Sequence, residues 1–536
     1  MRPKNIHPLF LSFATALCLL FLTSLTAKAQ SNVFPKWIST LPFATGASAF
    51  AADPAGNVFA VGDYCPPTCI HPQAFVFKFD QTGKIIWKDW LSNSNFNATA
   101  LDVGIDAESN VYVLFQLDKG GAQGSFINSE VVTAKYTSSG VRQWINFLSS
   151  PSGFSNEPVK LAVSPSGNAY VLYNSINVGE PGQIAIMKYN TNGQLQWSST
   201  TGVGGQSGNG ISLKLDAFEN SHVLASVDAP ARVGVAIVNS NGLTIGSTDP
   251  FQFDGVGDFS VDAGGHTYFV GSSAGSPAAI PSGPVVAKYS VDGTLIWYKT
   301  PPAEIGRIGS DPSGNTYLAY DSSDGLGLIK YDARGNQVWV SDYRDTSVIK
   351  GIEPAALTLN SANQIYVTGA GALLGDITSQ TVTAKFDSSG NEVWAIPYQN
   401  NSVISPTAMT IGGSGLFVLL NGTFVVDYVQ DAAELTPSAV TFADQKVGTQ
   451  STAQTVTLTN TAEQDLLISS ITESGSDFVL KNNCPTVLAP KATCTISVTF
   501  APTNVGNRTG TIAVRDDWAG SQTEPQTTTL FGIGTS

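Results

Sequence analysis

The sequence predicts an all-β protein: an eight-bladed β-propeller closed by an N-terminal strand, followed by an immunoglobulin-like β-sandwich. Tryptophan recurs at intervals of about 51 residues through the first 400 residues, and every interval contains two Gly- and Asn-rich turn sequences. Only 13% of the 536 residues are charged, whereas 52 are glycine. This composition disfavours helices, coiled coils and charge-rich disordered chains.

Residues 1–29 have the pattern of a signal peptide. Arg2 and Lys4 precede an apolar stretch, and the small-x-small motif Ala27–Ala29 places cleavage before Gln30. The apolar stretch is shorter than the ~20 residues of a comfortable membrane span, which disfavours the alternative of an uncleaved anchor. The sequence therefore predicts a secreted or cell-surface protein with no transmembrane span after cleavage.

The net charge argues against nucleic acid or an anionic membrane as the main partner. The full chain carries a net charge of −14, and cleavage lowers it to −17 because the removed residues include three basic and no acidic side chains. Such a surface repels phosphate groups.

Four cysteines remain after cleavage, and an exported protein uses an even number of cysteines mainly for disulfides. We expect the local pairs Cys65–Cys69 and Cys484–Cys494. A shared zinc site is the alternative, which the separation of more than 400 residues between the two pairs disfavours. Three residues separate Cys65 from Cys69, rather than the two of a thioredoxin-like redox motif.

Seven tryptophans define the repeat, and all but the first follow a glycine by four residues. The tryptophans are Trp37, Trp87, Trp144, Trp197, Trp297, Trp339 and Trp394. The glycines are Gly83, Gly140, Gly193, Gly242, Gly293, Gly335 and Gly390, with Gly246 standing where the fourth unit should have tryptophan. Each glycine ends a tight turn between two strands, and Asp or Asn caps the turn through its side chain.

A second turn lies upstream in every unit, as in Asp53–Asn57, so each unit has four short antiparallel strands. Eight upstream turns are present but only seven downstream turns. The last unit lacks a tryptophan strand, and the strand of Trp37 has no unit before it. We therefore expect this N-terminal strand to complete the eighth blade of a propeller over residues 30–432. Seven blades are the alternative, if residues 209–246 form an irregular insertion.

The repeat also contains a lysine in the third strand of most units. These lysines are Lys78, Lys135, Lys188, Lys288, Lys330 and Lys385. Because most have Asp or Asn two positions later on the same face of the strand, we expect a local pair at the turn rather than a ring that binds an anionic polymer. The tryptophans are expected to wedge between neighbouring blades.

The motif pair resembles the bacterial SBBP-type β-propeller repeat over residues 33–430. The resemblance rests on the Asp-x-x-Gly-Asn turn followed by an aromatic residue, and on Lys-aromatic-Asp-x-x-Gly-x-x-x-Trp, as in residues 78–87. It implies an architecture and leaves the activity open. The downstream turn is also similar to the quinoprotein repeat, but the adjacent cysteines implied by a quinone enzyme are absent. We expect no cofactor, and no motif indicates calcium.

Residues 433–536 form a second expected domain, of the size of one immunoglobulin-like sandwich. Residues 438–442, 454–458, 496–500 and 510–514 alternate like half-buried strands. The tract resembles the ASH domain of bacterial choice-of-anchor D proteins. The resemblance rests on residues 442–448, 457–460, 483–484, 494–496 and 501–503, Gly506 and residues 508–510. It implies a module for interaction or surface presentation.

The sequence contains few candidate catalytic, metal-binding or ligand-binding residues. The three histidines of the mature chain have no partner at metal-ligand spacing, and we assign no catalytic, cofactor or metal residue. The most distinctive loop runs from Tyr64 to His71, where prolines and the expected disulfide would stiffen it. Trp90 lies off the repeat interval and is a candidate for ligand stacking.

Three functions are compatible with these features. The sequence favours a secreted or surface-displayed bacterial binding or scaffold protein, whose ligand would be a protein, peptide or glycan at a channel mouth where the loops between blades converge. The first alternative is an extracellular carbohydrate or peptide lyase or hydrolase, which requires carboxylates from different blades at one mouth. The second is a structural component of the envelope or matrix. The sequence favours a non-enzymatic role without deciding it.

Overall fold

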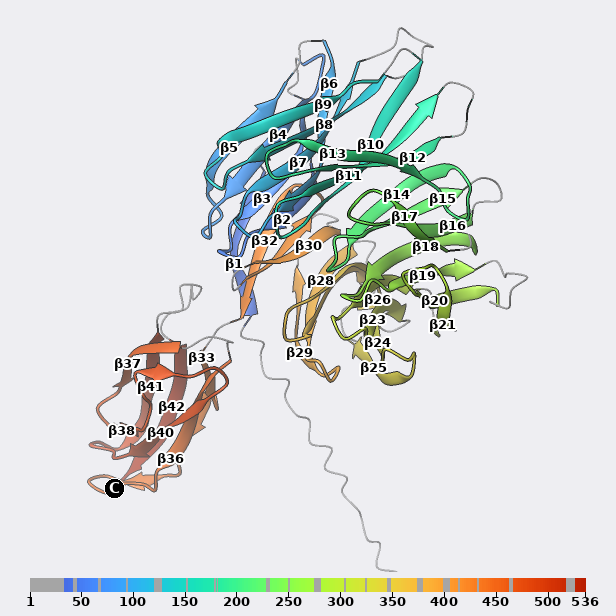
Figure 1. The fold of residues 1–536 in the computed structure, drawn as a ribbon. Helices are drawn as coiled ribbons and strands as arrows, with labels where there is room; N and C mark the ends of the chain where they lie inside the picture. The colour runs from blue at the N-terminus through green and yellow to red at the C-terminus, as the bar shows by residue number, and fades with distance from the viewer. Residues whose placement is uncertain are drawn as a thin grey trace, which may run out of the picture. The chain divides into compact units, whose positions relative to one another are not determined.

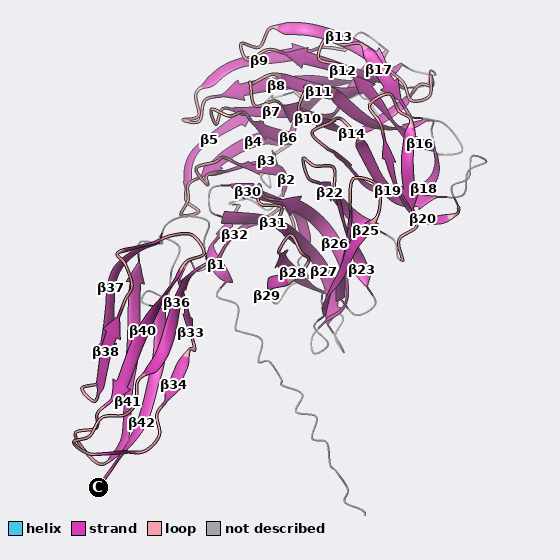
Figure 2. Ribbon diagram, turned by 60° about the horizontal axis from the view of Figure 1, so that its bottom comes forward, coloured by secondary structure: helices cyan, strands magenta, loops and turns pink. Residues whose placement is uncertain are grey.

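A computed structural model describes residues 33–536 with short gaps, and it contains only strands, turns and loops (Figures 1 and 2). The gaps are residues 42–45, 66–68, 93–94, 120–127, 151–152, 178–179, 181, 228–231, 249–250, 274–280, 303–304, 323–324, 345–348, 374–378, 399–404, 413–414, 431–432, 462–465 and 517–525. The expected signal peptide lies outside the described residues. Within the described part, no helix could cross a membrane.

The strands between residues 33 and 430 form propeller-like units of four antiparallel strands. The strands follow sequence order in every unit except the last, whose fourth strand comes from the start of the described chain. The first strands are β2 (Ala47–Ala52), β6 (Asn97–Ile105), β10 (Phe154–Val163), β14 (Gly208–Leu215), β18 (Phe251–Val261), β22 (Ile305–Ser310), β26 (Ile349–Leu359) and β30 (Pro406–Gly412). The second strands are β3 (Val58–Tyr64), β7 (Val111–Asp118), β11 (Ala169–Asn177), β15 (Ser221–Val227), β19 (Thr267–Ser273), β23 (Thr316–Ser322), β27 (Ile365–Leu373) and β31 (Gly415–Leu420).

The other two strands of each unit complete the sheets. The third strands are β4 (Gln73–Phe79), β8 (Ser129–Tyr136), β12 (Gln183–Tyr189), β16 (Arg232–Val238), β20 (Gly283–Tyr289), β24 (Gly325–Tyr331), β28 (Ser379–Phe386) and β32 (Phe424–Gln430). The fourth are β5 (Ile85–Leu91), β9 (Arg142–Leu148), β13 (Leu195–Thr201), β17 (Thr244–Ser247), β21 (Leu295–Lys299), β25 (Gln337–Arg344), β29 (Glu392–Tyr398) and β1 (Val33–Thr40). The Trp-less unit also has four strands, and β16 additionally pairs with the start of β18.

Side-chain caps and left-handed glycines explain the turns. In the downstream turn after β4, Asp80 Oδ1 accepts hydrogen bonds from the amides of Thr82 at 2.9 Å and Lys84 at 3.1 Å, and Gly83 has a φ of 78°. Such a conformation strains any residue with a Cβ, which is why glycine recurs there. The same cap forms in the upstream turn, where Asp53 Oδ1 accepts from the amide of Asn57 at 2.8 Å.

Apolar side chains pack between neighbouring sheets. Phe59 and Val61 of the first unit share one buried cluster with Val111 and Val113 of the second. Each first strand contacts the first strand of the next unit, and β30 contacts β2. At that boundary β1 pairs antiparallel with β32, so a strand from the N-terminus lies in the last unit.

Residues 433–535 form two packed sheets. One contains β33 (Ala433–Thr436), β36 (Gln454–Asn460), β40 (Thr493–Phe500) and β38 (Phe478–Asn482). The other contains β34 (Ala439–Thr441), β35 (Gln445–Lys446), β42 (Gln526–Thr535), β41 (Gly506–Asp516), β37 (Leu466–Ser474) and β39 (Val487–Leu488). Leu458 and Phe500 of the first sheet and Ile512 and Leu530 of the second belong to one buried core. This arrangement is a two-layer β-sandwich.

Candidate functional site

Six of the seven repeated tryptophans pack on a glycine of the neighbouring unit. A Cβ added to Gly140 would lie 2.7 Å from the Trp87 ring, and Trp87 Nε1 donates a hydrogen bond to the carbonyl of Ser138 at 3.1 Å. The same packing joins Trp37 to Gly83, Trp144 to Gly193, Trp197 to Gly242, Trp297 to Gly335 and Trp339 to Gly390. The glycines are therefore needed both for the left-handed turn and for the space that the ring fills.

Five of the six repeated lysines reach the same turn of the neighbouring unit. Lys78 Nζ donates to the Ser138 carbonyl at 2.9 Å, lies over the Phe59 ring at 5.0 Å, and is 3.8 Å from Asp53. Further pairs share one carbonyl in the same way: Lys135 and Trp144 at Thr191, Lys188 and Trp197 at Ser240, Lys288 and Trp297 at Ala333, and Lys330 and Trp339 at Ser388. We call this shared contact the inter-sheet latch.

The contacts in the latch differ from the local pairing at the turn that the sequence predicted for these lysines. The sequence suggested that Lys78 pairs locally with Asp80, but the Asp80 carboxylate caps its own turn instead. Lys78 extends across the sheet to the acid of the upstream turn and to the next unit. Its pKa is lowered because burial outweighs the nearby charge of Asp53. The repeated lysines are thus structural, and they do not form an open basic ring.

The fourth unit has different residues at all three positions that form the latch in other units. His222, Ile237 and Gly246 occupy the register positions that hold an aromatic residue, lysine and tryptophan in latched units. His222 is fully buried, with its ring nitrogens 2.8 Å from Thr267 Oγ1 and 3.3 Å from Asp216 Oδ2. This histidine resembles a catalytic base held by an acid, but its burial keeps substrate away and makes it a packing residue.

Glu219 compensates for a missing acid in the third unit. That unit has Ser164 where most upstream turns have Asp, and Glu219 of the next unit lies 3.3 Å from Lys188. Tyr170 and Ser166 donate hydrogen bonds to its carboxylate at 2.7 Å each. Burial alone would raise the pKa of Glu219, but these donors lower it to about 2.

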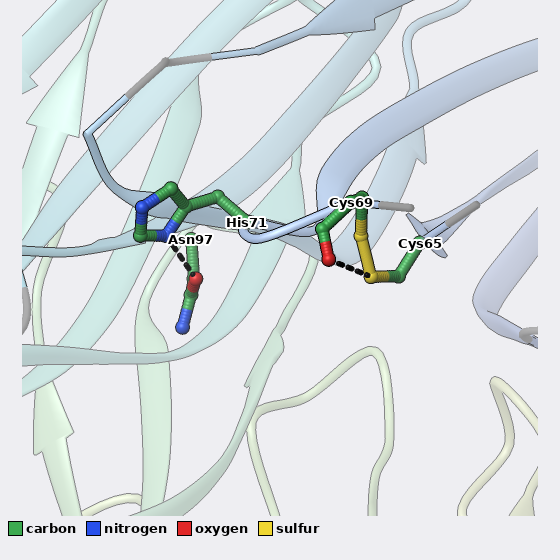
Figure 3. The surroundings of a disulfide bond; sticks show 4 residues. All are labelled: Cys65, Cys69, His71 and Asn97. Carbon is green, nitrogen blue, oxygen red and sulfur yellow. Dashed lines mark hydrogen bonds between the residues drawn. A yellow bond between two sulfur atoms is a disulfide. The ribbon is translucent and has the colours of Figure 1, made fainter. Parts of the chain in front are cut away.

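The predicted ligand loop lies where first strands begin and second strands end, an edge that we call the mouth. Cys65 and Cys69 lie at disulfide distance with their Cα atoms 5.5 Å apart, as the sequence predicted (Figure 3). His71 Nδ1 is 2.9 Å from Asn97 Oδ1 at the start of β6. Pro72 accepts a hydrogen bond from the amide of Ala98 at 3.0 Å. These contacts fix the described part of the loop to the neighbouring unit.

Trp90 is embedded in an aromatic cluster beside this loop. Its ring packs edge-on against Phe77 at 5.4 Å and Phe75 at 6.2 Å, and lies 6.1 Å from Tyr64. The half-buried ring therefore supports the base of the loop. Its role in ligand stacking stays a prediction.

Carboxylates from several units lie at the mouth. Burial raises the pKa of Glu157 on β10, and the charge of Asp118 on the preceding unit raises it further. Asp321 on β23 is exposed, but partial desolvation raises the pKa of its carboxyl group, and the charge of Glu353 of the following unit raises it further. Asp63, next to the ligand loop, also has a pKa raised by burial. Repulsion between carboxylates of neighbouring units therefore contributes to the raised pKa of Glu157 and of Asp321.

A further set of residues follows a β-bulge found in every first strand. We call it the inner belt: Ala49, Asp102, Lys160, Ser212, Asp258, Arg307, Ala356 and Ala408. Each lies four residues before the capping position of its upstream turn, for example Asp102 before Asp106. That constant spacing was the available signal, and sequence reasoning missed it because the side chains differ between units.

Within the described residues, no group of three or more His, Cys, Asp or Glu side chains could hold a metal ion. Cys484 and Cys494 of the sandwich lie at disulfide distance, with Cα atoms 5.0 Å apart, and Cys494 is buried in the core.

Residues 433–535 match the family model for Cep192 domain 4. A solved PapD-like domain 7 of human CEP192 is 15% identical and covers 20% of this chain and 86% of its own, with a TM-score of 0.16. No curated protein matches the sequence significantly.

Solved all-β proteins are similar to longer parts of the chain. The WD40 domain of SCAP from fission yeast is 9% identical and covers 74% of this chain and 98% of its own, with a TM-score of 0.40. A protein of unknown function from Bacteroides caccae is 11% identical and covers 66% of this chain and 97% of its own, with a TM-score of 0.31.

Proposed function

We propose that the protein is an exported binding protein whose propeller recognises a ligand at the mouth. The observation that carries this proposal is the set of carboxylates with raised pKa values, which come from separate units and do not take part in the inter-sheet latches. The repeated lysines and tryptophans serve packing, whereas the mouth residues differ from unit to unit. A rigid scaffold with variable residues at one edge suits recognition.

The architecture that supports this role is a closed eight-bladed ring. Eight units of four strands, the contact between β30 and β2, and the pairing of β1 with β32 support closure. Closure would remove the exposed edges of an open array and hold the mouth residues in a fixed ring around a central channel. The motifs favour assignment of the repeat to the bacterial SBBP type.

We propose that the ligand is a peptide or glycan that carries basic or amino groups. Positive charge would relieve the repulsion between Glu157 and Asp118 and between Asp321 and Glu353. The loop with Tyr64 and His71 would supply the neighbouring polar and aromatic contacts. The C-terminal sandwich, which resembles an ASH domain, would act as a spacer or docking module at the cell surface.

Peptide and glycan arrays probed with the mature chain test this function. We expect amine-bearing ligands to bind wild type and to lose at least tenfold in affinity with Glu157→Gln. The matched control is Glu473→Gln, which removes an exposed carboxylate from β37 of the sandwich and leaves binding unchanged. The proposal fails if the array shows no ligand, or if Glu157→Gln binds every ligand as wild type does.

Hydrolysis or elimination at the same mouth is a second candidate function. The specific observation is that Glu157, whose pKa is raised by burial and by the charge of Asp118, lies close to this carboxyl group of another unit. Two carboxyl groups at one site are the arrangement that general acid–base catalysis uses. Incubation with a panel of polysaccharides and peptides tests it. Turnover that Glu157→Gln abolishes would favour the enzyme, whereas binding without turnover favours recognition alone.

A further inference from the structure

The two disulfides of the chain lie in different surroundings. Cys494 is 5% exposed in the core of the sandwich, and Cys484 packs against the same core. Cys65 and Cys69 are each half-buried on the loop between β3 and β4, and neither belongs to a buried cluster of the described residues. A disulfide that solvent can reach is open to attack by a thiolate, whereas one enclosed by a core is protected.

The loop is held in place by contacts that do not involve its disulfide. The pairing of β3 with β4 extends to Tyr64 and Gln73 and joins the two ends of the loop. His71 Nδ1 lies 2.9 Å from Asn97 Oδ1 and anchors the stretch beside the disulfide (Figure 3). The two cysteines are only four positions apart in the sequence. After reduction the two thiols would therefore stay close together, and the bond could form again without refolding.

An exposed apolar side chain stands next to this disulfide. Ile70, between Cys69 and His71, is 86% exposed, the highest value for a large apolar side chain in the part of the chain that the structure describes. The disulfide fixes one of its neighbours, and the contact with Asn97 fixes the other. A side chain held in this way loses little freedom when it binds, so it suits contact with a residue that flanks a cysteine of another peptide.

We propose that Cys65 and Cys69 form an exchangeable disulfide that oxidises dithiols in exported or cell-surface peptides. A thiolate of the peptide attacks one sulfur of the loop, the S–S bond breaks, and the other loop sulfur leaves as a thiolate that takes up a proton. The second thiolate of the peptide then displaces the loop cysteine from the mixed disulfide. The peptide has lost two electrons and two protons and holds a disulfide, while the loop holds two thiols. A small disulfide such as oxidised glutathione restores the loop disulfide by the same exchange.

This activity goes beyond the proposed binding function and does not depend on the carboxylates of the mouth. It also differs from a thioredoxin-like motif, because three residues rather than two separate the cysteines. Exposure of the bond and the independent anchoring of the loop carry the assignment.

Reduction by a synthetic peptide with two reduced cysteines tests which disulfide reacts. The mature chain is mixed with this peptide, quenched with acid and alkylated, and mass spectrometry of its fragments follows each disulfide separately. We expect Cys65–Cys69 to be reduced at least tenfold faster than Cys484–Cys494, with one peptide disulfide formed per chain. Equal rates, or faster reduction of the sandwich disulfide, would overturn the assignment.

Turnover in the presence of oxidised glutathione tests catalysis. We expect wild type to oxidise the peptide at least tenfold faster than the double variant Cys65→Ser/Cys69→Ser, which measures the direct reaction with glutathione. The matched control is Cys484→Ser/Cys494→Ser, which should retain the wild-type rate. If this control does not fold, the comparison of the two disulfides within the wild-type chain still decides. Equal oxidation by wild type and Cys65→Ser/Cys69→Ser would refute the proposal.

Ile70→Ala tests the apolar contact with the peptide. The variant should slow oxidation of a peptide with apolar residues beside its cysteines at least threefold more than it slows reduction of the loop by dithiothreitol. This difference is expected because dithiothreitol is too small to make the contact. Equal effects on the two reactions would remove Ile70 from the site.

Discussion

Removing the charge of Glu219 should destabilise the propeller at neutral pH and have little effect near pH 2. The pKa of Glu219 is lowered from 4.5 to about 2. A difference of one pKa unit between the folded and unfolded states corresponds to about 1.4 kcal/mol of stability. The full lowering of the Glu219 pKa therefore corresponds to about 3 kcal/mol of stability. The Glu219 side chain is 24% exposed, and partial screening by water reduces our expectation to about 2 kcal/mol.

Proton linkage determines how the stability contribution of Glu219 changes with pH. A carboxyl with a lowered pKa in the folded state contributes its full stability above the unfolded pKa, and loses it as the pH falls toward the folded pKa. The stability difference between wild type and Glu219→Gln should therefore be largest at pH 7, shrink below about pH 4.5 and disappear near pH 2.

Urea unfolding at several pH values, followed by tryptophan fluorescence, measures this difference, because the repeat tryptophans lie between sheets. Glu473→Gln again serves as the control, with no pH-dependent difference expected. The reasoning is refuted if Glu219→Gln equals wild type at pH 7. It is also refuted if the difference is the same at pH 3 and pH 7.

Three further predictions concern the latch, the sandwich and the mouth. Gly140→Ala should lower the free energy of unfolding in urea by at least about 1 kcal/mol more than Gly153→Ala does. Both positions have a positive φ, but only a Cβ at position 140 would meet the Trp87 ring. Equal losses in the two variants would contradict the latch. Cys484→Ser should lower the free energy of unfolding of the sandwich by about 2 to 3 kcal/mol, measured by calorimetry, because the disulfide closes a short loop; an unchanged transition would contradict this. Binding of amine-bearing ligands should weaken as the pH falls from 7 to 4, because the raised pKa of Glu157 lets it lose charge earlier than an ordinary carboxyl; binding that strengthens over this range would contradict the acidic mouth.

Some features could be read from the sequence because local interactions determine them. A turn such as that of Asp80 and Gly83 forms from residues within four positions of each other, so its pattern recurs visibly in the chain. The pairing of Cys65 with Cys69 is local in the same way. The sequence also placed the tryptophans between units, because an aromatic residue at a constant interval suits a constant packing site.

Other features depended on contacts between units, which a linear pattern does not specify. The sequence identified the repeated lysines but gave Lys78 the wrong partner, because its acceptor lies 60 residues away in the next unit. Glu219 stands at the turn position that is glycine in several other units and has a φ of 60°. Only the contacts of the neighbouring unit reveal that its carboxylate replaces a missing acid.

By itself the sequence determined the all-β class, the four-strand unit and the residues that build each turn. Those features follow from periodicity and from hydrogen bonds between near neighbours in the chain. The tertiary structure alone decided which charges meet, as in the contact between Lys160 and Asp102 of neighbouring units and the paired acids of the mouth. Electrostatic effects depend on distance and burial in space, and residues of different units acquire both only when the sheets pack.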